Sequence, residues 1–287
     1  MRKITLFLLL SCILCVTHVR AQSPIQPIQV TETKRTYNDI TGILGAFADE
    51  VNLILMNVQQ KKEHVIQQIH FTEGVLNGRH VVVAQTGIGK VNAAITSTLL
   101  VEHFQPRELI FTGIAGGINP QLAPGDLVIG TTVAHHDYGT INPDGMLLRS
   151  TRNPFSMVEN PIYFPCDGVL IHLAEQASKK IILERIGGTV GRAPKISSGV
   201  IVTGDVFVSS TTATQVLRKQ MNAEATEMEG ASVAQVCWQQ RVPFIVIRSL
   251  SDDAGNNAHM DVKTFYQVAA RNSSNLVMAM AGALGEK

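Results

Sequence analysis

The stretch 243–252, PFIVIRSLSD, contains a continuous apolar run that ends in a serine and an acid. An unbroken run of this kind, rich in β-branched residues, is typical of a parallel strand that is covered by helices on both faces. The stretch therefore predicts a central strand of an α/β sheet with Asp252 at its carboxyl end. Ligands of open α/β sheets bind beyond the carboxyl ends of the strands, which makes Asp252 a candidate functional residue.

Further apolar runs predict strands at residues 40–47, 80–87, 108–117, 126–136 and 199–207. Segments with helical patterns lie at 90–104, 168–181, 230–240 and 262–284. Strands that alternate with helices predict a three-layer α/β domain. Residues 139–161 lack periodicity and are dense in turn-forming residues, so we expect a long ordered loop there.

The N-terminal segment differs in composition from the rest of the chain. Arg2 and Lys3 precede a short apolar run, and Ala21 comes before the polar sequence QSPIQP. This order is typical of a secretory signal peptide, so we expect residues 1–21 to be removed and the protein to be exported, periplasmic or secreted. An uncleaved anchor and a lipoprotein cleavage site at Cys12 are the alternatives. We expect residues 22–38 to form a leader without a core and residues 39–287 to form one domain.

The composition limits the classes of partner. The 287 residues carry a formal net charge of +1 and are 45% hydrophobic. The near-neutral charge gives no electrostatic reason to expect nucleic acid or an anionic membrane as a partner, and we expect no stable membrane span after cleavage. Cys166 and Cys237 remain once residues 1–21 are removed, and two cysteines do not make a disulfide framework in a domain of this size. Cys237 lies on an apolar helix face, where we expect it to belong to the core.

Polar residues and glycines follow several of the predicted strands. In chain order these are Asp49 and Glu50, the turn TGIGK (86–90), IAGG (114–117), Asp205 and Phe207, and Asp252 and Asp253. Glu227 and Glu229 stand in ATEMEGASVAQVC (225–237), in front of a predicted helix whose N-terminus an acidic side chain could cap. We expect these acids, glycines and one aromatic residue to converge at a single edge of the sheet.

Two short motifs suggest other chemistries but do not meet their requirements. TGIGKV (86–91) resembles a phosphate-binding loop, which needs a glycine five residues before Gly89 and a serine or threonine after Lys90. This chain has Ala84 and Val91 at those positions. HHD (135–137) contains metal-ligating residue types without a second cluster to complete a site. We therefore expect no metal and no cofactor.

Seven motifs occur along the chain in this order: GILGAFADEV, TGIGKVNAA, TGIAGG, GDLVIG, IVTGDVF, EMEGASVAQVC and IRSLSDDAG. The combination resembles the nucleoside phosphorylase and nucleosidase superfamily, and more closely the methylthioadenosine/S-adenosylhomocysteine nucleosidases, from about residue 40 to residue 284. The resemblance implies a three-layer αβα fold with a mixed, twisted central sheet, a homodimer, and a small-molecule purine nucleoside as the partner.

The resemblance also implies roles for individual residues. Glu50 matches the glutamate that activates the attacking water, and Asp252 matches the acid that protonates the purine. Glu229 matches the glutamate that holds the ribose hydroxyls. The other substrate-binding positions implied by the resemblance are Met228 beside the sugar, Phe207 stacked on the base, Val208 with backbone contacts to it, Arg248 near the catalytic water, and Ile88, Ala115 and Gly116 in the pocket lining.

These residue types suit the cleavage of an N-glycosidic bond. The purine anion is a poor leaving group, so an acid must share a proton with its N7, and a second carboxylate can direct water to the opposite face of the sugar. A buried aspartate can donate that proton if burial raises its pKa. Glu227 has no role implied by the resemblance, so we expect it to cap the helix or to form a surface ion pair.

Three alternatives remain at this point. Phosphorylases of this superfamily bind phosphate through arginines, but this chain has GAFADEV after its first strand and Ile110 and Phe111 before the TG turn, which favours water as the nucleophile. A non-catalytic storage protein would not need Glu50, Glu229 and Asp252. The chain departs from the family pattern at Ile114 and, in the expected 5′-substituent pocket, at Phe47 and Val262. The third alternative is therefore an enzyme that acts on a wider set of nucleosides.

Overall fold

The structure, a computed structural model, describes residues 36–143, 145–154, 156–186, 192–255 and 258–286, apart from the side chains of 259–264. The chain divides into two units, residues 1–35 and 36–287, and every described residue belongs to the second. The expected signal peptide therefore lies outside the described residues. The second unit begins three residues before the expected domain boundary at 39. Within the described ranges, no helix combines the length and the apolar character needed to cross a membrane.

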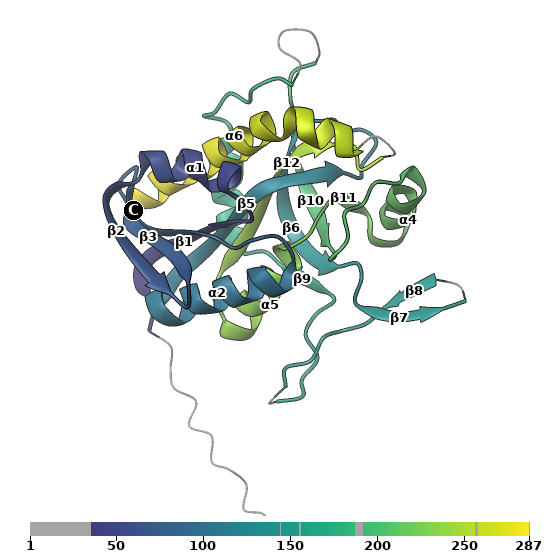
Figure 1. The fold of residues 1–287 in the computed structure, drawn as a ribbon, viewed down its shortest axis with the longest axis horizontal. Coiled ribbons are helices and arrows are strands. Elements are labelled where there is room, and N and C mark those ends of the chain that lie inside the picture. Colours follow the sequence, from purple (N-terminus) through teal and green to yellow (C-terminus); the bar gives the residue numbers. More distant parts are fainter. Residues whose placement is uncertain (1–35, 144, 155, 187–191, 256–257, 287) are drawn as a thin grey trace, which may run out of the picture. The chain divides into compact units, whose positions relative to one another are not determined.

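Strands and helices alternate in the second half of the described chain, as the sequence predicts, whereas several strands follow one another directly in the first half (Figure 1). The strands are β1 (Asn38–Gly45), β2 (Gln59–Ile66), β3 (Ile69–Leu76), β4 (Arg79–Gln85), β5 (Pro106–Gly117), β6 (Leu127–His135), β7 (Gly139–Asn142), β8 (Gly145–Leu148), β9 (Tyr163–Pro165), β10 (Ile196–Thr203), β11 (Ala223–Glu227) and β12 (Phe244–Asp252). The helices are α1 (Ala48–Asn57), α2 (Lys90–Phe104), α3 (Gly168–Ser178), α4 (Thr211–Met221), α5 (Gly230–Gln240) and α6 (Ala258–Gly285).

One large mixed sheet forms the centre of this unit. Its strand order is β11-β10-β6-β12-β5-β1-β4-β3-β2, and β9 pairs with β6. The sheet contains two sets of parallel strands. The first set is β4, β1, β5 and β12, and the second is β6, β10 and β11. The two sets are joined by the antiparallel pairing of β12 with β6. The last residues of β11 also pair antiparallel with the last residues of β5, where Thr226 lies opposite Gly116. This pairing closes β5, β12, β6, β10 and β11 into a ring.

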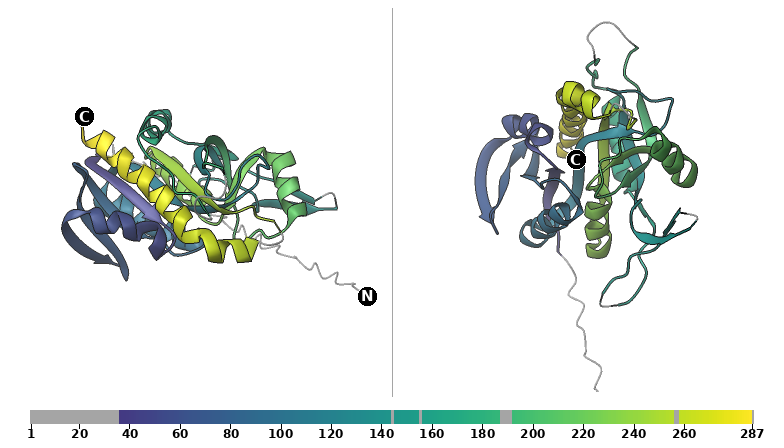
Figure 2. Two further views of the ribbon diagram at one scale, coloured as in Figure 1. Left: turned by 90° about the horizontal axis from the view of Figure 1, so that it is seen from above. Right: turned by 45° about the vertical axis from the view of Figure 1, so that its right-hand side comes forward.

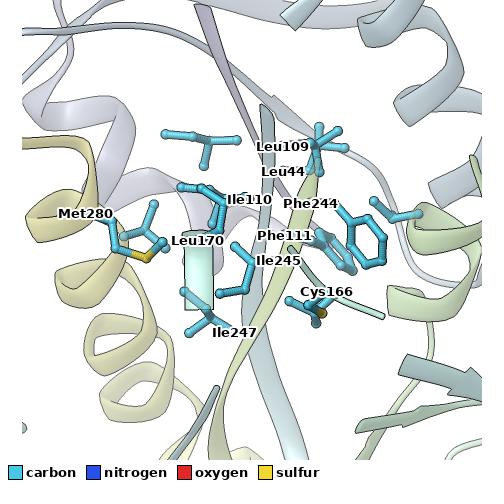
Figure 3. Packing of buried hydrophobic residues seen from close by; sticks show 14 of the residues in the cluster. Leu44, Leu109, Ile110, Phe111, Cys166, Leu170, Phe244, Ile245, Ile247 and Met280 are labelled. Atoms are coloured by element: carbon cyan, nitrogen blue, oxygen red, sulfur yellow. The ribbon is translucent and has the colours of Figure 1, made fainter. Parts of the chain in front are cut away.

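Helices cover both faces of the sheet, so the three-layer αβα prediction is confirmed. Helices α1, α3 and α6 pack together on one face, and α2 and α5 lie side by side on the other (Figures 1 and 2). Neighbouring residues on the central strands point to opposite layers. Figure 3 shows Ile110 and Ile245 on the side of Met280, which belongs to α6, and Phe111 and Phe244 on the other side.

Two of the predicted helices agree with the structure at both ends. The ranges predicted for α2 and α5 coincide with the observed helices, and Cys237 is fully buried in α5 as expected. The region 139–161 is not only a loop, because β7 and β8 pair as a hairpin within it. The strand predicted at 199–207 ends at Thr203, and the residues that follow form a loop beside the cavity described next.

Candidate active site

A cavity of about 420 Å³ lies where β1, β5, β10, β11 and β12 end. It is lined by Ala46, Phe47, Glu50, Ile88, Ile114, Ala115, Gly116, Val206, Phe207, Val208, Thr226, Glu227, Met228, Glu229, Ser251, Asp252 and Tyr266. The sequence predicts convergence at one edge of an open sheet, but β10 and β11 run opposite to β5 and β12. The acids meet because the ring closure brings the carboxyl end of β11 against the carboxyl end of β5.

Glu50 is held by backbone groups of two strand ends. It is the third residue of α1, and its Oε2 accepts hydrogen bonds from the N–H groups of Ala46 (2.5 Å) and Phe47 (3.2 Å). Its Oε1 accepts one from the N–H of Ile114 at the end of β5 (2.9 Å). Oε1 therefore keeps a lone pair that can accept a further hydrogen bond. Burial raises the pKa of Glu50 to about 7, although the charge of Arg248 and the three N–H groups act in the opposite direction.

Glu229 precedes the first residue of α5, and its Oε1 accepts a hydrogen bond from the N–H of Gly89 at 2.7 Å. Its side chain is buried in the cavity wall. Burial and the neighbouring charge of Glu227 raise the pKa of Glu229. The single anchor leaves Oε2 available to a ligand, and one carboxylate can bind two adjacent hydroxyl groups.

Glu227 forms a buried ion pair, so the expected surface pair is wrong. Its Oε2 lies 2.6 Å from an Arg248 guanidinium nitrogen, and both side chains are at most 2% exposed. The alternative prediction, a helix cap, is confirmed, because Glu227 accepts hydrogen bonds from the N–H groups of Glu229 and Gly230 at the start of α5. It also accepts one from the Thr203 hydroxyl. The ring closure buries this carboxylate, so its charge needs the counterion.

Arg248 is the one residue predicted to bind substrate that does not line the cavity. It lies behind the wall, with its guanidinium carbon 4.2 Å from the centre of the Phe111 ring and its charge paired with Glu227. It still acts on the cavity at a distance, because its charge opposes the rise in the pKa of both Glu50 and Glu229.

Asp252 ends β12 and is 2% exposed. Its Oδ2 accepts a hydrogen bond from the Ser251 hydroxyl (2.8 Å), and its Oδ1 accepts one from the N–H of Ala254 (2.7 Å). A side chain at Gly116 would meet Oδ1 at 2.8 Å, so the glycine of IAGG gives the carboxylate its space. The carboxylate is thus fixed in the wall of the same cavity as Glu50 and Glu229.

The rest of the lining is largely apolar. The predicted residues Phe207, Val208, Met228, Ile88, Ala115 and Gly116 all lie in it. The rings of Phe47 and Tyr266 are 6.4 Å apart at their centres. The sequence predicts Phe47 in this pocket but not Tyr266, although Tyr266 follows Val262 by one helical turn. The side chain of Val262 lies outside those described.

The HHD stretch does not form one cluster of ligands. The His135 ring contacts Gln235 and Phe164, the His136 ring lies against Gly204, and Asp137 pairs with Lys90. In the described part of the chain, no group of three or more histidine, cysteine or acidic side chains is placed to hold a metal ion.

Comparisons with known proteins agree with this arrangement. The family model described as the phosphorylase superfamily matches residues 40–281. The 5′-methylthioadenosine/S-adenosylhomocysteine nucleosidase of Halalkalibacterium halodurans is 38% identical over 85% of this chain and 98% of the relative. The nucleosidase of the same name from Neisseria meningitidis, solved in complex with methylthio-immucillin-A, is similar in structure with a TM-score of 0.74, at 33% identity over 86% of this chain and 100% of that chain. The futalosine hydrolase of Helicobacter pylori has a TM-score of 0.71 at 30% identity over 84% of this chain and 97% of that chain.

Proposed function

Because the chain belongs to the phosphorylase superfamily, we propose that it hydrolyses the N-glycosidic bond of purine nucleosides of the 5′-methylthioadenosine/S-adenosylhomocysteine type and releases adenine. The observation that carries the proposal is one cavity lined by Glu50, Glu229 and Asp252. Glu50 is the base that directs water to the sugar, Asp252 supplies the proton to N7 of the leaving purine, and Glu229 holds the ribose hydroxyls.

The same cavity favours water over phosphate as the nucleophile. The backbone N–H groups of Ala46, Phe47 and Ile114, which could hold an anion, already bind the Glu50 carboxylate. None of the described lining residues is a lysine or arginine, and Arg248 is paired with Glu227. A phosphate dianion would therefore enter a site of carboxylates without a counterion, which costs free energy.

The proposal is tested on a panel of purine nucleosides in ¹⁸O-labelled water, with and without phosphate. We expect free adenine, one ¹⁸O atom in the released sugar, and a rate that is independent of phosphate. A sugar 1-phosphate would show a phosphorylase. Tight adenine binding without turnover of any nucleoside would show a storage protein.

The 5′ group is proposed to contact Phe47 and Tyr266. These rings form an apolar wall of the cavity, which suits a methylthio group or a larger substituent. Since a similar structure is that of a futalosine hydrolase, the nucleoside panel includes futalosine beside methylthioadenosine and adenosylhomocysteine.

The rate of the reaction should depend on the protonation of Glu50. With its pKa near 7, the base loses its active form as the pH falls, and we expect kcat/KM to fall about tenfold per pH unit on the acid side. The folded state binds this proton more tightly than the unfolded chain does. The contribution of Glu50 to the free energy of unfolding is therefore largest at low pH and is lost as the pH rises to about 7. Parallel pH profiles of kcat/KM and of the thermal midpoint measure both effects. The Glu50→Ala variant should lack this acid limb, and a flat native profile below pH 7 would exclude Glu50 as the base.

Gly113 faces the Glu50 carboxylate and should be as necessary for activity as Glu50 itself. A Cβ atom at this position would overlap the Glu50 carboxylate, so Gly113→Ala must displace it. We expect kcat to fall by at least about 10², as for loss of general-base catalysis. Gly168→Ala is the matched control, because a Cβ atom there meets nothing within 4 Å. Equal activity of the two variants would contradict the assigned position of Glu50.

A homodimer is also part of the proposal. Val91 and Ile95 on α2 and Trp238 on α5 are exposed apolar side chains on two helices that pack together, and a second copy could cover them. Sedimentation of the purified protein tests this, with a monomer at micromolar concentration as the contrary result.

Export of the mature domain is proposed from the basic, apolar and small-residue order of residues 1–21. Cell fractionation with N-terminal sequencing of the mature protein tests it. A mature chain that starts at Gln22 is the expected result, whereas a lipidated Cys12 or an intact N-terminus in the cytoplasm would contradict it.

A further inference from the structure

The motifs TGIGK (86–90) and HHD (135–137), which lack the features of a phosphate-binding loop and of a metal site, lie close together beside the cavity. Lys90 is the first residue of α2, and its Nζ lies 2.7 Å from Oδ1 of Asp137, which follows β6. The two side chains are only 20% and 22% exposed. Although burial opposes it, the hydrogen bond from Lys90 holds the pKa of Asp137 below its ordinary value. The two side chains therefore form an ion pair that is largely shielded from water.

Asp205 closes this pair into a ring. The N–H of Asp205 donates to Oδ2 of Asp137 (2.8 Å), and Oδ1 of Asp205 accepts from the N–H of Lys90 (2.7 Å). The Lys90–Asp137–Asp205 ring thus joins three segments that are distant in sequence. The Asp205 carboxylate also lies at the N-terminus of α2, where the helix dipole favours a negative charge.

The segments that the ring joins carry part of the cavity lining. Val206 and Phe207 follow Asp205 directly, and Ile88 precedes Lys90 by two residues. All three are exposed and line the cavity, so they lie at its mouth. None of the three ring residues lines the cavity itself.

Two glycines allow these segments to approach each other. Gly89 has φ of +96°, and a Cβ atom there would lie 3.2 Å from Oδ1 of Asp205. A Cβ atom at Gly204 would overlap the ring of His136. The N–H of Gly89 also donates to Glu229, so the start of α2 contacts both Asp205 and the carboxylate that is proposed to hold the ribose.

We propose that Asp137 is a positioning residue that fixes the loop carrying Phe207 against the start of α2 and thereby sets the affinity for the nucleoside. This inference rests on the proposed function. In the proposed function, Phe207 and Ile88 contact parts of the nucleoside that do not react, so their displacement removes uniform binding. Loss of the ring should therefore raise KM and leave kcat nearly unchanged.

The test uses Asp137→Ala, Asp137→Asn, Lys90→Met and the double variant Asp137→Ala/Lys90→Met, with methylthioadenosine as substrate. For Asp137→Ala we expect KM to rise about tenfold, the scale of one charge-assisted hydrogen bond, and kcat to stay within about threefold. Asp137→Asn keeps an acceptor for the N–H of Asp205 and should fall between Asp137→Ala and the native protein. The double variant should have the KM of Asp137→Ala, because Asp137→Ala already removes the ion pair that Lys90→Met breaks. Arg271→Met, which breaks an exposed pair with Glu184, is the control and should leave KM unchanged.

A second measurement separates this inference from the proposed function. Hydrogen exchange at residues 204–208 reports on the ring directly, and Asp137→Ala should accelerate it while weakening adenine binding, whether or not any nucleoside is hydrolysed. An active native enzyme whose KM is the same in Asp137→Ala would overturn the positioning role and leave the nucleosidase intact. Native-like exchange in Asp137→Ala would overturn the ring as the device that fixes this loop.

Discussion

The Asp252→Asn variant is expected to bind adenine and nucleosides much as the native protein does and to lose a factor of about 10²–10⁴ in kcat. The amide cannot supply the proton that the leaving purine needs at N7. The fold should tolerate the change, because the asparagine oxygen can still accept from the N–H of Ala254. The Ser251 hydroxyl, which donates to Asp252, can turn to accept from the new amide group and still reach the Ala115 carbonyl.

Asp253→Asn is the matched control for this variant. Asp253 is exposed and accepts a hydrogen bond from the N–H of Gly255, which an asparagine can also accept. Single-turnover rates and adenine titrations of both variants separate chemistry from binding. Normal turnover by Asp252→Asn would show that the proton comes from another group.

The second large effect concerns stability. Arg248→Met should lower the free energy of unfolding by about 3–5 kcal/mol, because the Glu227 carboxylate then stays buried without its counterion. Glu227→Gln in the same chain removes that charge, so the double variant should recover much of the loss. Denaturant unfolding of the single and double variants measures both values.

The control for this prediction is an exposed ion pair. Arg271→Met breaks the pair with Glu184, whose side chains are 40% and 44% exposed, and should change stability by at most about 1 kcal/mol. If Arg248→Met were no more destabilising than Arg271→Met, the buried pair would not be needed to hold the closed ring of strands.

The sequence predicts the parts of the fold that rest on local pattern. The buried central strand β12 is a continuous apolar run, and the ranges of α2 and α5 agree with those predicted from the sequence. Strand β11, AEATE, is fully buried but contains no apolar run, and its partners come from distant parts of the chain. Strand β2 is almost entirely polar and exposed, and helix α1 is short. Their existence depends on pairing and packing that local sequence does not encode.

In the candidate site, too, some features are predicted from the sequence and others depend on long-range pairing. Glu50, Glu229 and Asp252 were predicted from the family resemblance and lie in one cavity. The burial of Glu227 and the place of Arg248 behind the wall could not be predicted, because both depend on the pairing of β11 with β5.

Whether Glu50, Glu229 and Asp252 surround one nucleoside can be seen in a crystal structure of Asp252→Asn with methylthioadenosine bound. We predict that Glu229 accepts hydrogen bonds from both ribose hydroxyls, that a water bound to Glu50 faces the anomeric carbon, and that the residue 252 amide lies beside N7. A nucleoside bound outside this cavity, or bound with Glu50 and residue 252 on the same face of the sugar, would show that these acids do not have the proposed roles.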